Sequence, residues 1–293
     1  MDAEPTRQRE LSISTSFDYD VPIELQIPLI TAAGFTHVSL GGREAHSGYL
    51  SKGSRMRLKT LVQRHSLRID TIHGPRADQP GSIELLSEVA EAAADLSAPV
   101  VVAHGGPFAF DEAELPARLE GLLSVCEALG PIAARTGVVF ALENVLPGPA
   151  TDLVRQALPH LNPRHFGFCY DSAHDQIGGP RPFDLLDELR DRAVAVHLSD
   201  RVREFVDHVL PGEGFIDWEA LAGHLRALSL AGPLLLEVMV THSAEKETRR
   251  FLQLAGERGA WLWDLVLGGG PMGATAPRRS NDPEERPDGC PGL

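Results

Sequence analysis

The sequence FGFCYDSAH at residues 166–174 begins as an apolar run and turns polar at Asp171. A short, nearly continuous apolar run is typical of a parallel strand that is covered on both faces. Similar runs recur along the chain, at residues 11–16, 37–40, 68–72, 100–103, 138–142, 194–198 and 234–238. Between them lie longer segments with apolar residues at three- and four-residue spacing, which predict helices, for example at residues 82–96, 115–136 and 218–229. Eight strand-helix units predict the α/β class and a single (β/α)8 TIM barrel.

The ends of two predicted helices carry residues that suit helix termini. Gly137 and Gly232 follow helical segments, so we expect them to supply the positive φ that often ends a helix. Asp217 directly precedes Trp218 and is a candidate N-cap, because its side chain can accept a hydrogen bond from the first helical turn.

The chain length fits one large domain. Single α/β barrels commonly have about 250 residues, and we assign residues 11–267 of the 293 to the barrel. Residues 1–10 form a polar N-terminal tail, and residues 268–293, rich in Gly, Pro and charge, are expected to be a disordered C-terminal tail. No stretch of about 20 apolar residues occurs. We therefore expect a cytoplasmic protein that does not interact with a membrane.

Composition disfavours several classes of function. The net charge of −14 opposes binding to a polyanion, and no dense basic run lies in the predicted barrel, so nucleic acid is an unlikely partner. The three cysteines are far apart and predict neither a disulfide framework nor a CxxC site. None of the three lysines ends an apolar strand, which argues against Schiff-base chemistry.

Six of the predicted strands end in side chains that can bind metals. These residues are His73, His104, Glu143, Asp171, His197 and Glu237. The carboxyl ends of barrel strands meet at one rim, where the active sites of such barrels lie. Burying so many carboxylates and imidazoles together is costly, and a divalent cation offsets that cost. The mixed ligand set suits Mn²⁺, Zn²⁺, Co²⁺ or Fe²⁺, and Mg²⁺ less well.

Short motifs recur at these strand ends and in the loops that follow them. They are HGP at 73–75, HGG at 104–106, LEN at 142–144, YDSAH at 170–174, HLSD at 197–200, PGEGFIDW at 211–218 and LLLEV at 234–238. In this order they resemble the xylose isomerase-like TIM barrel superfamily over residues 11–267. That superfamily includes sugar phosphate isomerases and epimerases, inosose dehydratases and endonuclease IV. The motifs are much less specific for one reaction than for the superfamily.

The resemblance to the isomerase and epimerase branch implies roles for several residues. It implies that Glu143, Asp171, His197 and Glu237 bind a single metal ion. Glu143 and Glu237 are also the implied catalytic residues, because they match carboxylates on either side of the substrate carbon that loses and regains a proton. His174 and Arg203 match positions that contact substrate oxygens in some epimerases. The implied substrate is a small polyhydroxylated molecule.

The resemblance to endonuclease IV implies a different use of the same rim. His73, His104, His174 and His208 match the additional ligands of a trinuclear zinc site. That site needs an Asp two residues before the last His, where this sequence has Val206. These histidines are therefore assigned either to substrate binding or to a second metal.

The leading hypothesis is a divalent-metal-dependent isomerase or epimerase of a small sugar, sugar phosphate or related polyol carbonyl compound, acting by carboxylate-mediated proton transfer. Its alternatives are an endonuclease IV-like phosphodiesterase at abasic DNA, an inosose dehydratase-like lyase and a noncatalytic binding barrel. The exact substrate, the metal and the oligomeric state stay open, with a homodimer as one option.

Overall fold

The computed structural model describes residues 9–175 and 181–268. Most of both predicted tails, residues 1–8 and 269–293, lies outside the described residues. Eight parallel strands form a closed barrel in sequence order, and β1 pairs with β8. The strands are β1 (Leu11–Ser14), β2 (His37–Leu40), β3 (Arg68–His73), β4 (Val100–His104), β5 (Val139–Glu143), β6 (Phe166–Asp171), β7 (Ala193–Leu198) and β8 (Leu234–Leu236). The predicted fold is confirmed.

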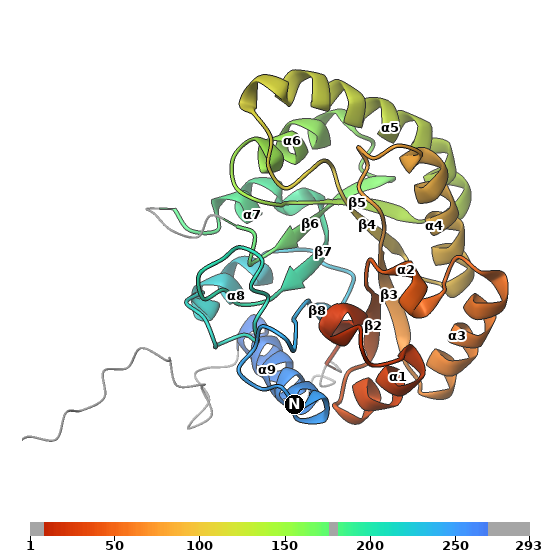
Figure 1. Ribbon diagram of the computed structural model, residues 1–293. Helices are drawn as coiled ribbons and strands as arrows, with labels where there is room; N and C mark the ends of the chain where they lie inside the picture. Colours follow the sequence, from red (N-terminus) through yellow and green to blue (C-terminus); the bar gives the residue numbers. More distant parts are fainter. Residues whose placement is uncertain (1–8, 176–180, 269–293) are drawn as a thin grey trace, which may run out of the picture.

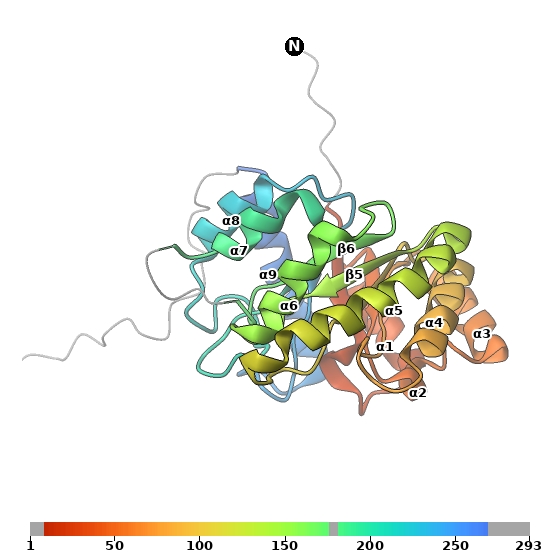
Figure 2. The same cartoon turned by 90° about the horizontal axis from the view of Figure 1, so that it is seen from above.

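Helices surround the strands, as Figure 1 shows. They are α1 (Ile23–Ala32), α2 (Glu44–Ser47), α3 (Lys52–Arg64), α4 (Ser82–Leu96), α5 (Leu115–Thr136), α6 (Pro149–Ala157), α7 (Asp184–Leu189), α8 (Trp218–Arg226) and α9 (Thr248–Val266). Short 3-10 helices cover Thr15–Asp18, Glu112–Glu114, Leu158–His160 and Arg190–Arg192. α9 packs against both α1 and α8, so the last helix completes the ring, and the view in Figure 2 shows α4 and α5 side by side. Among the described residues no helix has the length and apolar character needed to span a membrane.

Local sequence accounts for several element boundaries. Gly137 has a φ of 73° and ends α5, as predicted. The Asp217 side chain accepts a hydrogen bond from the backbone N–H of Ala220 and caps α8. The prediction for Gly232 was wrong, because α8 already ends at Arg226 and Ala227 is its C-cap residue.

The side chains inside the barrel are small. Val100, Val102, Ala141, Cys169 and Ala195 form an apolar cluster of their own, separate from the main core. The main core lies between the strands and the helices, where apolar positions of the strands meet those of the helices. The barrel therefore has two apolar layers, and the inner one contains little side-chain volume.

Asp70 is a buried carboxylate near the amino-terminal end of this interior. Its Oδ1 accepts a hydrogen bond from the Ser12 hydroxyl at 2.7 Å, and the residue is 5% exposed. Burial raises the pKa of Asp70 from 3.8 to about 6. The folded protein therefore binds the proton of Asp70 more tightly than the unfolded chain does. The contribution of Asp70 to the stability of the fold consequently falls as pH rises from about 4 through 6.

We expect Asp70→Asn to remove this pH-dependent loss. Relative to the wild type, the free energy of unfolding of the variant should rise by up to roughly 3 kcal/mol between acidic pH and pH 8, as a pKa shift of about two units implies. Urea unfolding at pH 4 and pH 8, which span most of this range, measures both proteins. A difference between them that does not change with pH would contradict the assignment.

Candidate metal centre

The six strand-end residues lie together at the carboxyl end of the barrel. Four of them, Glu143, Asp171, His197 and Glu237, each offer a ligand atom within 4.8 Å of the other three. Nδ1 of His197 lies between two carboxylates, 3.0 Å from Glu143 Oε1 and 2.8 Å from Glu237 Oε2. The strands thus bring together the four residues expected to form one metal site.

Glu143 also belongs to a second group. Its Oε2 atom lies 3.1 Å from His73 Nε2 and 3.2 Å from His104 Nε2. The carboxylate is fully buried. Its Oε2 atom faces His73 and His104, whereas its Oε1 atom faces His197. A residue placed in this way can contribute to two neighbouring ligand groups.

A third group contains Asp171, His174 and His208. His174 Nδ1 lies 3.6 Å from Asp171 Oδ2, and the rings of His174 and His208 are 5.1 Å apart. His208 has a φ of 44°, which is unusual outside glycine, and its Nδ1 hydrogen-bonds with the Ser199 hydroxyl. The loop between β7 and α8 therefore holds His208 at the rim.

Asp207, the neighbour of His208, turns away from this group. Its Oδ2 accepts hydrogen bonds from the backbone N–H groups of Val202, Arg203 and Glu204. Val206, where endonuclease IV has its additional Asp ligand, is 45% exposed. Neither residue gives the third group a carboxylate of the kind that the trinuclear site requires.

Two atoms in these groups are buried without a hydrogen bond within the described part of the chain. They are Asp171 Oδ2 and His174 Nε2. Buried polar atoms nearly always have partners, because leaving one unsatisfied costs about 1–3 kcal/mol. A cation held by the four-residue group would satisfy Asp171 Oδ2, and carboxylate and imidazole donors suit a divalent transition metal. The residues present therefore fit a bound divalent ion.

Charges within the cluster shift its pKa values strongly. Burial alone would raise the pKa of Glu143, but the adjacent imidazoles, His197 foremost, hold this pKa well below its usual range. Burial would also raise the pKa of Glu237, yet His197 lowers it to about 2. Conversely, the pKa of His197 is well above its usual value, since the effect of burial is outweighed by Cys169 and by both glutamates. In the metal-free protein His197 thus supplies the positive charge between two ionised carboxylates, and a bound metal ion would take the place of its proton.

Asp171 and His174 shift in the opposite sense. Burial raises the pKa of Asp171 to about 7, and burial lowers the pKa of His174. A neutral imidazole is the form that binds metals, and a carboxylate with a pKa of about 7 exchanges its proton readily near neutral pH. Both groups can therefore reach the protonation state that binds a cation at a pH near neutral.

Arg203 is not brought into contact with the cluster. It is exposed on the loop after β7, and its backbone N–H binds Asp207. Arg201 is the buried arginine of this loop: it donates hydrogen bonds to the carbonyl oxygens of Ala173 and Asp175 and lies over the Phe205 ring. A contact between Arg203 and a substrate stays a prediction.

Two features of the site were missed from the sequence. The Phe108 ring lies edge-on to His104 at 5.1 Å and to His174 at 5.7 Å, beside two of the three groups. Asp200 is fully buried and accepts hydrogen bonds from Gly212, Ile216 and Trp218. The signal for Asp200 was its position in HLSD, ahead of PGEGFIDW; Phe108 had only its closeness to HGG.

Known proteins are similar to this chain in sequence or in structure. A protein named y4fM from Sinorhizobium fredii (strain NBRC 101917 / NGR234) is 24% identical, with 75% of this chain and 82% of that protein covered. A solved D-tagatose 3-epimerase-like protein superposes with a TM-score of 0.72 at 19% identity, covering 88% of this chain and 98% of its own. The 3-keto-D-glucoside 4-epimerase YcjR from E. coli has a TM-score of 0.66 at 18% identity, covering 87% and 98%.

The family comparison covers most of the barrel. The model of the xylose isomerase-like TIM barrel family matches residues 27–255 of the 293-residue chain. This range includes every strand-end residue of the cluster. The chain therefore belongs to the xylose isomerase-like TIM barrel family.

Proposed function

We propose that this protein is a divalent-metal-dependent isomerase or epimerase of a small sugar or a related polyol carbonyl compound. The observation that carries the proposal is the pair of carboxylates, Glu143 and Glu237, on one imidazole nitrogen of His197. Two carboxylates around one centre can serve two faces of a substrate carbon. Proton removal from one face and return to the other changes the configuration at that carbon.

The proposed metal ligands are Glu143, Asp171, His197 and Glu237. When bound, the ion supplies a Lewis acid that polarises a carbonyl or hydroxyl oxygen and makes the adjacent proton easier to remove. Mn²⁺, Zn²⁺ and Co²⁺ suit the mixed donors better than Mg²⁺. The metal itself is to be identified by experiment.

Glu237 is the better placed of the two carboxylates to accept a proton. Its side chain is 15% exposed, whereas that of Glu143 is fully buried between imidazoles. Its pKa is lowered to about 2, chiefly by His197, so Glu237 is ionised at neutral pH and is in the form that can accept a proton. Glu143 is proposed as the partner that serves the opposite face.

His73, His104, His174 and His208 surround this centre and are proposed to bind substrate oxygens, with a second metal ion as the alternative. Imidazoles can donate or accept a hydrogen bond, which suits hydroxyl groups. Phe108 adds an apolar surface beside His104 and His174, against which a carbon face of the substrate can pack. A small polyhydroxylated compound fits these neighbours.

The names of structural neighbours support the same substrate class. They include the D-tagatose 3-epimerase-like protein, the 3-keto-D-glucoside 4-epimerase and a D-psicose 3-epimerase from Clostridium cellulolyticum H10. Incubating metal-loaded protein with free and phosphorylated ketoses, and separating the products by chromatography, tests the proposal. Formation of an isomer or epimer is the expected result, whereas a dehydrated product would favour a lyase.

The second candidate is a phosphodiesterase acting at abasic DNA. The three overlapping ligand groups favour it, because such enzymes use several ions. The net charge of −14 and the orientation of Asp207, whose carboxylate turns away from the third ligand group, argue against it.

We expect no useful cleavage of an abasic duplex, because an acidic protein repels the phosphate backbone. A gel assay with added Zn²⁺ or Mn²⁺ measures nicking, with a duplex lacking the abasic site as the control. Efficient nicking that disappears in His208→Ala would establish the phosphodiesterase instead.

A further inference from the structure

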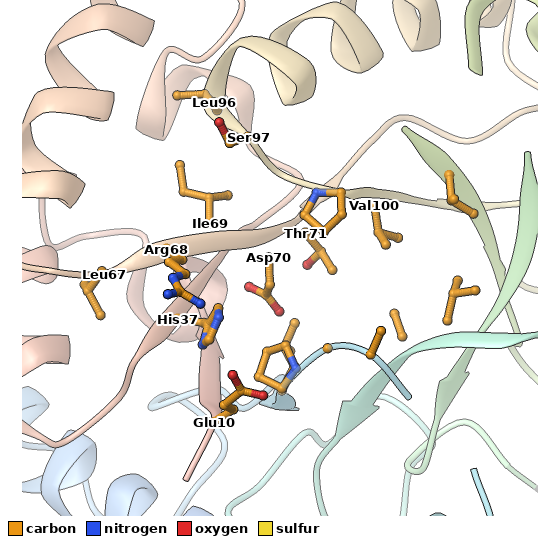
Figure 3. Close-up of a pocket in the computed structure, with 18 of the residues that line it drawn as sticks. Glu10, His37, Leu67, Arg68, Ile69, Asp70, Thr71, Leu96, Ser97 and Val100 are labelled. Carbon is orange, nitrogen blue, oxygen red and sulfur yellow. The ribbon is translucent and has the colours of Figure 1, made fainter. Parts of the chain in front are cut away.

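A large cavity lies at the amino-terminal end of the barrel, opposite the metal centre. Its volume is about 680 Å³, and it is lined by the first residues of β3, β4, β5 and β7 and by the segment before β8. Ligand pockets in proteins commonly measure roughly 300–1,000 Å³. Figure 3 shows this cavity with Asp70, His37, Arg68 and Glu10 around it. The proposed sugar chemistry uses none of these residues.

The inner part of the cavity combines a carboxylate with aliphatic walls. Val100, Val139 and Leu235 line it together with the buried Asp70. Ser12 Oγ donates a hydrogen bond to Asp70 Oδ1 at 2.7 Å. A carboxylate that is held out of water among aliphatic side chains favours a ligand that brings positive charge and N–H donors.

The rim carries charges of both signs. Glu10 contributes a carboxylate, while Arg68 and Lys59 contribute cations. The Lys59 ammonium already donates a hydrogen bond to the carbonyl oxygen of Asp95. Asp70 is the charged group in the inner part of the cavity. The charge of a ligand's head group there is therefore set by Asp70 and not by the mixed charges of the rim. Aliphatic walls also suit a carbon chain better than a polyol, whose hydroxyls would lose their hydrogen bonds to water there.

We propose that this cavity is a second binding site, for a small organic ammonium ion with a short aliphatic chain. The ammonium group hydrogen-bonds with Asp70, and the chain packs against Val100, Val139 and Leu235. This site stands apart from the proposed isomerase function, since its residues lie at the opposite ends of the strands.

Three probes of equal length test the proposal by isothermal titration calorimetry on metal-loaded protein. They are pentylammonium, pentan-1-ol and pentanoate, which differ mainly in the head group. We expect saturable binding of pentylammonium on the order of millimolar or tighter, weaker binding of the alcohol and none of pentanoate. Equal binding of all three, or no binding of the amine, would overturn the proposal.

Variants place the amine within the molecule. Asp70→Asn should weaken pentylammonium binding about tenfold or more, as expected for loss of a charged hydrogen-bond partner, and leave pentan-1-ol binding unchanged. Glu10→Gln, at the rim, is the matched control and should change amine affinity by less than about threefold. Glu237→Gln reports on the acidic cluster at the other end. If amine binding is lost in Glu237→Gln and kept in Asp70→Asn, the amine binds at the metal centre and the proposal is wrong.

If Asp70→Asn does not fold, a crystal structure of the wild type with pentylammonium shows where the amine binds. The expected result is an ammonium nitrogen within hydrogen-bond distance of the Asp70 carboxylate. Electron density for the amine only at other places would overturn the site.

Discussion

Glu237→Gln is expected to lower the rate of proton exchange at the reacting carbon of a substrate by about 10² to 10⁴. Gln is close to Glu in size and keeps an oxygen that can coordinate a metal weakly, but it cannot accept a proton at neutral pH. Deuterium incorporation from D₂O into a substrate measures the exchange, with metal content determined on the same samples. Glu143→Gln should have a similar effect, because the two carboxylates are assigned to opposite faces.

The matched control for these variants is His104→Gln, which alters a neighbour of Glu143 and leaves both carboxylates in place. Its loss of exchange should be smaller than that of either glutamate variant. If Glu237→Gln and Glu143→Gln stay loaded with metal and exchange at the wild-type rate, the carboxylates act only as ligands.

Asp200→Asn is expected to destabilise the fold by roughly 2–5 kcal/mol. Oδ1 of Asp200 accepts from the N–H groups of Arg201 and Ile216, and Oδ2 accepts from Gly212 N–H and Trp218 Nε1. In either orientation of the Asn side chain, its NH₂ group faces two N–H donors and cannot accept from them. Each donor left without an acceptor costs about 1–3 kcal/mol. Urea unfolding of the metal-free protein measures the loss.

Asp217→Asn serves as the control for Asp200→Asn. Asp217 caps α8 from an exposed position, and Asn is about as good an N-cap as Asp, so stability should hardly change. Equal stability of Asp200→Asn and the wild type would mean that the loop is held by other contacts.

The fold was predictable because parallel barrels repeat one pattern. Strands such as β4 and β6 are buried along their whole length, so each appears in the sequence as a continuous apolar run. The strand-end residues were predictable for a related reason. Once the barrel closes, residues that follow each run must meet at one rim, and Glu143, Asp171 and His197 do so.

Positions in long loops were less predictable. Nothing in the spacing of Arg201 and Arg203 tells which one is buried; the aromatic rings of Phe205 and Phe215 and two backbone carbonyls fix Arg201. The close packing at Gly214 has the same origin, since an added Cβ would collide with the carbonyl oxygen of Arg201. Such contacts depend on how the loop after β7 folds back on itself.

The cavity at the amino end was also invisible in the sequence. Its existence depends on which strand residues point inward and on their size, as Ala195 and Val100 illustrate. Apolar runs show that a strand is buried, but they do not show which alternate residues face the barrel axis. Asp70 therefore looked like an ordinary polar residue within a strand.

The metal content of purified protein tests the central claim most directly. Elemental analysis after incubation with Mn²⁺ or Zn²⁺ and dialysis should find about one ion per chain, because four convergent ligands complete one site. His197→Ala should lose most of this ion, while His104→Ala, which lies outside the four-residue group, should keep it. A wild type that retains no ion, a His197→Ala variant that retains the full amount, or three zinc ions per chain would contradict the single metal centre.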